Sequence, residues 1–157
     1  MATRNPNSTG VHLWLVLMKA HKALEQGAMR SIAGTGLCIS DFSVLETLLH
    51  KGPLPVNTIG AKIALTSGSS TAAIDRLEKK GLVRRAADPT DRRTRIVHLT
   101  DKGRTLIEAA FRKHATDIES VTSVLSISEQ KVLTDLLKKL GKTAVSGPAS
   151  DFSSTKG

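Results

Sequence analysis

Apolar residues recur at helical spacing along most of the chain, and glycine or proline interrupts the pattern at a few places. Residues 11 to about 31 are predicted to form a long helix, because apolar side chains share one face. The segment GTG at residues 34–36 ends it. A second helix is predicted for ISDFSVLETLLHKG, with Ser40 as N-cap and Gly52-Pro53 as its end. The apolar positions of the first helix are Leu13, Leu17, Ala20 and Leu24.

Two shorter helices and a hairpin are predicted next. VNTIGAKIAL gives a short helix, and TSGSSTAAIDRLEKKG gives another that is capped by Thr66 or Ser67 and ended by Gly81. LVRRA and RIVHLT read as short strands, and DPTDRRT between them supplies turn-forming residues. Ile96 and Leu99 are expected to anchor the second strand to the helices.

The C-terminal part is again helical in pattern. Thr100 or Asp101 can cap a helix that runs to about residue 124, and Ser126 or Ser128 can cap a last one over SEQKVLTDLLKKLGK. Residues 1–10 and 144–157 are rich in small and polar residues and are predicted to be disordered. The predicted fold class is mainly α with a small β-hairpin. One face of the last helix carries Leu133, Leu136, Leu137 and Leu140.

Charge is concentrated in the middle of the chain. The 157 residues carry a formal net charge of +9. Residues 62–104 hold eleven Lys and Arg against five Asp and Glu, so six of the nine excess charges lie there. Such a patch predicts a polyanionic partner, most commonly nucleic acid. A solvated basic face is the alternative.

Other classes of protein find little support in the sequence. The one cysteine, Cys38, excludes an intramolecular disulfide and a metal motif built on cysteines. No stretch approaches the ~20 apolar residues of a membrane span, so a cytoplasmic protein without membrane partners is expected. No catalytic motif, phosphate loop or metal-ligand spacing stands out, and we therefore expect neither an enzyme nor a cofactor.

Two short helices followed at once by a hairpin are the order that a winged helix-turn-helix requires. In that motif the second helix enters the major groove of DNA. Small hydroxyl side chains at its start can donate to bases and phosphates. The bland alternative is a Ser/Thr-rich helix start that satisfies its own amides. The candidate contacts here are Thr66, Ser67, Ser69, Ser70 and Thr71.

The segment GLVRRAADPTDRRTRIVHLTDKG, with STAAIDRLEKK before it, resembles the signature of the MarR (multiple antibiotic resistance regulator) family. The resemblance extends over about residues 11–142. It implies a dimeric, mostly helical repressor whose two winged helix-turn-helix lobes bind a pseudo-palindromic operator. It also implies that Asp91 braces the wing, that Arg93 enters the minor groove, and that Arg92 contacts phosphate.

Other arginines near the wing are candidates with less defined roles. Arg84 and Arg85 are adjacent on a strand and point to opposite faces, so we expect at most one, Arg84, to contact DNA. Arg95 is expected to project toward DNA with Arg93. Arg76 is a candidate contact, but a local ion pair with Asp75, Glu78 or the wing is as plausible for it.

The resemblance divides residues 11–143, a single domain, into a winged helix-turn-helix at about 40–100 and dimerisation helices at about 11–33 and 101–143. VHLWLVLM at residues 11–18 is apolar nearly all round, which a surface helix of a monomer would not tolerate. An ordinary buried helix in a monomer is the alternative. A dimer would place two recognition helices about one turn of DNA apart.

The resemblance also implies a small aromatic or phenolic ligand that binds between the dimer helices and the DNA lobe and releases DNA. Candidate pocket residues are Trp14, Met18, His21 and Phe42, and an ordinary core position is the alternative for each. Cys38 is expected to be buried and inert, because no Lys or Arg lies within seven positions of it. An architectural DNA-binding protein without a ligand switch is the alternative function.

Overall fold

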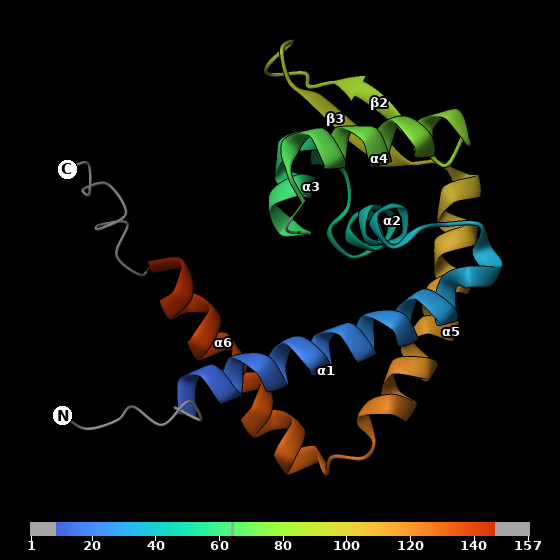
Figure 1. Cartoon of the computed structure of the whole chain (residues 1–157). Coiled ribbons are helices and arrows are strands. Elements are labelled where there is room, and N and C mark those ends of the chain that lie inside the picture. Colours follow the sequence, from blue (N-terminus) through green and yellow to red (C-terminus); the bar gives the residue numbers. More distant parts are fainter. Residues whose placement is uncertain (1–8, 64, 147–157) are drawn as a thin grey trace, which may run out of the picture. The chain divides into compact units, whose positions relative to one another are not determined.

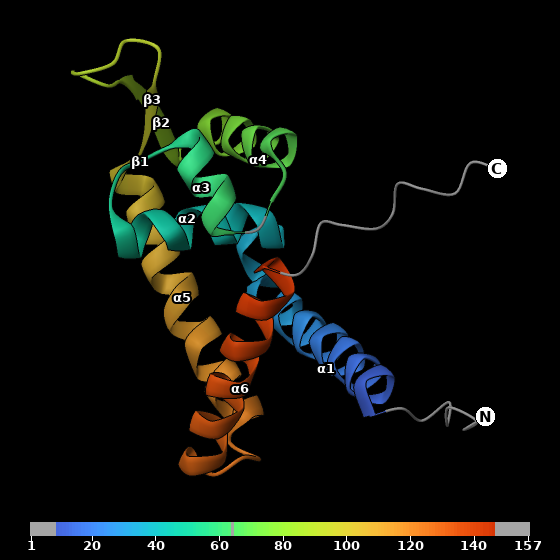
Figure 2. The ribbon, with the colours of Figure 1, turned by 90° about the vertical axis from the view of Figure 1, so that its left-hand side faces the viewer.

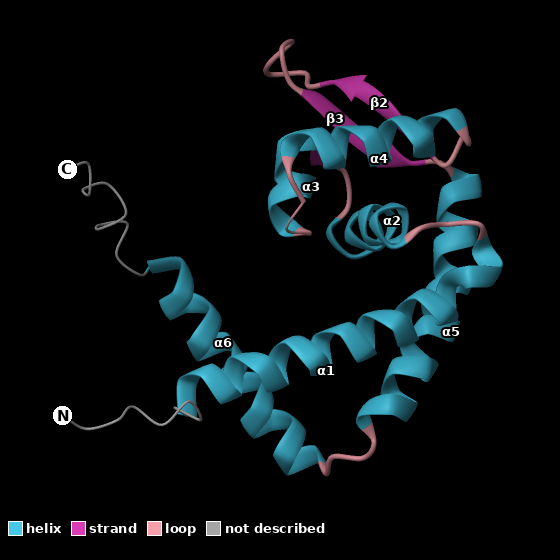
Figure 3. Cartoon of the chain, in the orientation of Figure 1, coloured by secondary structure: helices cyan, strands magenta, loops and turns pink. Residues whose placement is uncertain are grey.

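The computed structural model describes residues 9–63 and 65–146, with side chains to residue 144. Long helices stand at both ends of the described chain: α1 (Thr9–Ile32) and α2 (Ile39–Lys51) at the start, α5 (Asp101–Thr122) and α6 (Ile127–Ser146) at the end. The short helices α3 (Val56–Lys62) and α4 (Ser67–Lys79) lie between them. The predicted fold class, mainly α with a small antiparallel sheet, is confirmed (Figure 3).

Two compact units make up the chain, Met1–Ile118 and Glu119–Gly157. The first holds α1 to α4, the sheet and most of α5, and the second holds α6. The ends predicted to be disordered fall mostly outside the described residues, but Thr9 and Gly10 begin α1 and residues 144–146 end α6.

The sheet has one strand more than the hairpin. β2 (Val83–Ala87) and β3 (Arg95–Leu99) pair antiparallel, as predicted. The two-residue strand β1 (Leu54–Pro55) adds to the other edge of β3, so the strand order is β1-β3-β2. The sequence did not indicate β1, because two residues next to Pro53 carry no alternation to detect. β1 ties the start of α3 to the base of the wing, the β2–β3 hairpin with its connecting loop.

The hydrophobic core lies among α2, α3, α4, the sheet and the first half of α5. Leu45, Leu48, Ile59, Ile74 and Leu77 are completely or almost completely buried in it. On β3 the buried residue is Val97, with Leu99 partly buried beside it, whereas Ile96 was predicted. Residues 96 and 99 cannot share one face of a strand, since side chains alternate with a period of two.

Caps position the helices around this core, mostly as predicted. The Thr66 hydroxyl accepts a hydrogen bond from the Ser69 amide and so caps α4. Thr100 caps α5 by accepting from the Gly103 amide, and its own hydroxyl donates to the Gly81 carbonyl. For α2 the prediction was wrong, because the helix begins at Ile39 and Cys38 occupies the N-cap without a side-chain bond.

Candidate nucleic-acid interface

The first turn of α4 presents small hydroxyl side chains to solvent. Thr66, Ser67, Ser69 and Thr71 are exposed, and Gly68 among them leaves the helix surface flat. The Thr66 hydroxyl donates to the Ser69 Oγ at 2.9 Å, so part of this group is engaged in its own cap. The remaining hydroxyls can still donate and accept at the protein surface.

Ser70 is an exception, and its predicted contact with DNA is wrong in this conformation. Its side chain is 1% exposed, and its Oγ donates to the Ser67 carbonyl at 3.0 Å. Ser70 packs against Gly60 of α3 so closely that a Cβ at Gly60 would lie 2.8 Å from the Ser70 Oγ. This contact sets the distance between the two helices of the helix-turn-helix.

The loop at the tip of the wing is shaped by two aspartates that accept local hydrogen bonds. Asp91 accepts from the Arg93 amide and the Thr94 hydroxyl, both at 2.9 Å. Asp88 accepts from the Thr90 hydroxyl and amide, and these bonds lower the pKa of its carboxyl. Asp91 therefore makes the contacts that a brace needs.

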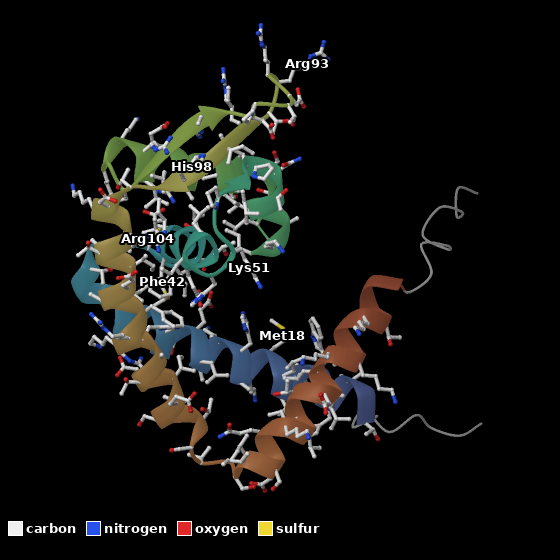
Figure 4. All side chains as sticks on the ribbon, turned by 180° about the vertical axis from the view of Figure 1, so that it is seen from behind. Met18, Phe42, Lys51, Arg93, His98 and Arg104 are labelled. Atoms are coloured by element: carbon white, nitrogen blue, oxygen red, sulfur yellow. The ribbon has the colours of Figure 1, made fainter. Side chains whose placement is uncertain are left out.

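The arginines of the wing project from this loop into solvent. Arg92, Arg93 and Arg95 are exposed, and within residues 9–63 and 65–146 none has a carboxylate partner. Figure 4 shows the Arg93 side chain at the tip, directed away from the helices, and Figure 2 shows the loop extending beyond them. Guanidinium groups that no carboxylate neutralises are available to phosphate and to the minor groove.

Arg84 and Arg85 lie on opposite faces of β2, as predicted. Arg84 is exposed opposite His98 of β3. Arg85 forms ion pairs with Asp75 and Glu78 of α4, and its amide donates to Glu78 Oε1 at 3.0 Å. Burial lowers the pKa of Arg85, but the bonds to the two carboxylates outweigh that effect and raise it. This ion-pair cluster joins the wing to α4, which lies across the hairpin in Figure 1.

Arg76 is bound on the other side of α4, to a partner that the sequence did not indicate. Its Nε and Nη2 donate to Asp41 Oδ1 at 3.1 and 2.7 Å, and Lys80 lies 3.5 Å from Asp41 Oδ2. The bond to Asp41 raises the pKa of Arg76. The Asp41 side chain is 2% exposed, so a nearly buried carboxylate anchors α4 to α2. The ion pair that was expected as the alternative for Arg76 is therefore present, but its partner is Asp41.

Cys38 is exposed, so its predicted burial is wrong. Its Sγ lies 3.2 Å from the Ser40 hydroxyl and 3.6 Å from Arg76 Nη2. No basic residue is close to this thiol in the sequence, because Arg76 lies 38 positions away and comes near it only in the folded protein. The same fold explains the exposure, since Cys38 stands at the N-cap of α2 on the surface.

The four residues predicted to form a ligand pocket do not come together. Trp14, Met18 and His21 are exposed on α1, whereas Phe42 is buried and packs against the ring of His114 at 4.9 Å. Figure 4 shows Met18 and Phe42 well apart. His114 Nδ1 also lies 2.7 Å from the Ser31 hydroxyl, which links α5 to the end of α1.

A pocket of about 430 Å³ lies instead between α2 and α3. Its volume falls within the range for small-molecule sites. Lys51, Lys62 and His50 line it, and Glu46 is the one carboxylate in its lining. The uncharged lining residues are Ser43, Thr47 and Ile63.

Two helices expose apolar side chains that the described chain does not cover. On α1 the exposed residues include Val11, Leu13, Trp14 and Leu15, and Trp14 is 59% exposed. On α6 no side chain up to residue 144 is buried. Its apolar face, with Val132, Leu133 and Leu136, lines a hydrophobic depression of about 420 Å³. Exposed apolar patches of this kind mark interaction sites.

The described residues show no metal site and no single membrane-spanning helix. Among the described residues, no group of three or more His, Cys, Asp or Glu is arranged to hold a metal ion. No single helix of the described chain is long and apolar enough to cross a membrane; Thr9–Thr35 with Ile39–Lys51 reaches that length only as a pair bent by 81°.

An exposed hydroxyl-bearing helix beside a basic wing, on a lobe of this topology, defines a winged helix-turn-helix DNA-binding protein. The model of the MarR family matches residues 37–94, from the start of α2 to the wing loop. Over 132 residues the chain is 42% identical to the HTH-type transcriptional regulator MhqR of Bacillus subtilis, spanning 84% of this chain and 91% of that protein. The chain belongs to the MarR family of transcriptional regulators, as the resemblance predicted, and is not an enzyme.

Solved structures agree on the fold. A MarR variant from E. coli in complex with operator DNA superposes with a TM-score of 0.78 at 22% identity, covering 87% of this chain and 99% of that one. BpsR of Bordetella bronchiseptica, whose DNA binding is regulated by 6-hydroxynicotinic acid, gives 0.77 at 24% identity, covering 89% and 98%.

Proposed function

We propose that the protein is a homodimeric repressor that binds a pseudo-palindromic operator and is released from it by a small aromatic or phenolic ligand. The proposed mode of DNA binding is supported mainly by the exposed wing arginines, which lie beside the hydroxyl side chains of α4. In the described chain these arginines have no carboxylate partner. In this geometry α4 occupies the major groove and Arg93 enters the neighbouring minor groove. A protein with this function works in the cytoplasm.

The proposed contacts differ from the set expected from sequence at two positions. Ser70 is left out because its side chain is buried, and Arg76 because Asp41 engages its guanidinium. Asp91 keeps the role of a brace for the wing. The retained contacts are Thr66, Ser67, Ser69, Thr71, Arg84, Arg92, Arg93 and Arg95.

The exposed apolar faces of α1 and α6 support the homodimer. Each buried leucine contributes about 1.5–3 kcal/mol, so these faces favour association with a second copy. A two-fold dimer would also match the symmetry of a pseudo-palindrome, because each subunit reads one half-site.

The pocket between α2 and α3 is our candidate effector site, in place of the four residues expected from sequence. Lys51 and Lys62 offer charge to a carboxylate, and the hydroxyls of Ser43 and Thr47 offer partners to a phenol. A ligand that shifts α3 would also shift α4, since Gly60 and Ser70 leave no space between them. The regulation of BpsR by a hydroxylated aromatic acid supports this class of ligand.

The wing assignment is tested with Arg93→Ala. We expect operator affinity to fall by about 1–3 kcal/mol, with a weaker preference for A·T pairs beside the half-site. Mobility-shift titrations on a duplex selected from random DNA measure this loss. Arg104→Ala is the control, because Arg104 is an exposed arginine on α5 that pairs with Glu108. Equal affinity of Arg93→Ala and the parent would show the wing assignment to be wrong.

The effector site is tested with 6-hydroxynicotinic acid as the probe and its uncharged amide as the control. We expect the acid alone to release the operator, and Lys62→Gln to require about tenfold more of it, since a charge-assisted hydrogen bond is lost. If no aromatic acid in a panel of such compounds changes DNA binding, the alternative of an architectural DNA-binding protein is favoured.

A further inference from the structure

A groove of about 290 Å³ lies between the wing, where its loop joins β3, and the starts of α3 and α4. Asn57 of α3 and Ser67 of α4 line one side of it. The other side is formed by Arg93, Thr94 and Arg95 of the wing. The sequence did not single out Asn57, because α3 looked like a short supporting helix.

The lining of this groove is basic and contains no carboxylate. The nearest acidic residues along the chain, Asp88 and Asp91, are held in the wing loop by bonds to their own neighbours. In the described part of the chain, neither Arg93 nor Arg95 has an ion-pair partner. A groove whose lining includes two unpaired arginines and no opposing charge attracts an anion.

Uncharged donors face the same space. The Asn57 side-chain oxygen accepts from the Thr58 amide at 2.9 Å, which leaves the amide nitrogen as the group that can donate to a ligand. The Ser67 hydroxyl is exposed at the first residue of α4. A guanidinium, an amide and a hydroxyl are donors that proteins commonly direct at DNA phosphates.

The position of the groove identifies the anion. If α4 occupies the major groove and Arg93 the adjacent minor groove, the sugar–phosphate strand that separates these grooves must pass between α4 and the wing. We propose that this groove seats one phosphodiester of that strand, held by Arg95 and by the Asn57 amide and Ser67 hydroxyl. This phosphate seat rests on the proposed function, because it requires that placement of α4 and the wing.

In this arrangement Arg95 and Arg93 contact different parts of the DNA. Arg93 stands at the tip and reaches the minor groove, whose width and potential depend on sequence (Figure 4). Arg95 begins β3 opposite Ala87, where the loop joins the hairpin, and meets a phosphate that every sequence presents. Arg95 therefore contributes affinity and register without contributing base preference.

The test combines protein variants with single neutral phosphates. An operator duplex selected by the full-length protein is made as a series, each member carrying one methylphosphonate in one half-site. We expect the neutral group at one position, or at two adjacent ones, to weaken the parent about tenfold, because a charged hydrogen-bond acceptor is lost. Arg95→Gln removes the contact from both subunits, so binding of the unmodified duplex should weaken about 100-fold, and that same methylphosphonate should have no further effect. Asn57→Ala should show the same non-additivity with a smaller loss.

Two controls make the result specific. Lys139→Gln on α6 removes one exposed charge and should leave the full methylphosphonate effect in place. Arg95→Lys keeps the charge, so the slope of log affinity against log salt should match that of the parent. Arg95→Gln removes one charge from each subunit and should reduce the magnitude of that slope by about two. If Arg95→Gln is weakened by a methylphosphonate as much as the parent at every position, the proposed phosphate seat is wrong, although the protein still binds DNA. A protein that selects no DNA sequence would overturn the proposed function and the seat together.

Discussion

Apolar side chains are buried in the lobe formed by residues 37–103 but are exposed along the helices α1 and α6. In the lobe, Leu45, Ile59 and Ile74 have no exposed surface at all. On α1 and α6, by contrast, Trp14 is 59% and Leu136 58% exposed. The lobe thus buries its own apolar side chains, whereas the two helices carry apolar surface that the described chain leaves exposed. We therefore expect substitutions in the lobe to act on folding and substitutions on the two helices to act on association.

The largest effect is expected at the apolar face of α6. Leu136→Asp with Leu140→Asp would place four charges in a two-fold interface and remove four leucines from it. We expect the dissociation constant of the dimer to rise by on the order of 1,000-fold or more. Analytical ultracentrifugation measures this change, and circular dichroism checks that the lobe stays folded. Lys138→Asp, on the side of the same helix opposite to the leucines, is the control. A double variant that remains dimeric would show that α6 is not the interface.

A substitution in the core of the lobe should act on folding instead. Leu45→Ala creates a cavity in a completely buried site, and we expect the free energy of unfolding to fall by about 2–5 kcal/mol. Urea denaturation followed by circular dichroism measures this loss. Leu137→Ala is the matched variant on α6, and its effect on stability should shrink as the protein is diluted below the dissociation constant of the dimer, because it acts through association. The comparison fails if both losses depend on concentration to the same degree.

A smaller effect is expected at the carboxylate that joins α2 to α4. Asp41→Asn keeps the shape of the side chain but removes the negative charge that holds Arg76 and Lys80. Because Arg76 is nearly half exposed, solvent screens the pair, and we expect a loss of about 1–3 kcal/mol in stability. Operator affinity should fall as well, although Asp41 touches no DNA, since α4 loses an anchor. Asp75→Asn, which leaves Arg85 paired with Glu78, should cost less in both assays.

The smallest effect is expected at the cap of α6, which is local and independent of assembly. Glu129 accepts from the Ser126 amide and hydroxyl, and these bonds lower its pKa below the ordinary 4.5. The stabilisation is therefore complete above about pH 4.5 and is lost as the pH falls through the lowered pKa. Hydrogen exchange of the Ser126 amide should be faster in Glu129→Ala than in the parent at pH 7. At a pH below the lowered pKa the two proteins should exchange at the same rate.

Local chemistry made much of the lobe predictable from sequence. Gly52, Gly81 and the cap residues Thr66 and Thr100 mark helix boundaries through contacts within a few residues, and the structure has them where the pattern placed them. The turn residues around Asp91 likewise indicated the wing. In each case the signal and its cause lie in the same short segment.

What the sequence did not reveal depends on residues brought together by folding. Asp41 looked like an ordinary residue in the first turn of a helix, and its partner Arg76 lies 35 positions away. The exposure of Cys38 and the separation of Trp14 from Phe42 likewise follow from packing. The anchor of β3 was missed for another reason, because Val97 and Leu99 share one face of the strand and Ile96 lies on the other.

The loop at the wing tip has a further consequence for how such regulators diversify. Its bonds all run among residues 88–94, and the backbone bond from the Asp88 amide to the Thr94 carbonyl closes it at 3.1 Å. The conformation of the loop is thus fixed by its own residues, and the loop is joined to the lobe through the ends of β2 and β3. Its arginines can be exchanged, by evolution or by an engineer, without any compensating change in the core beneath.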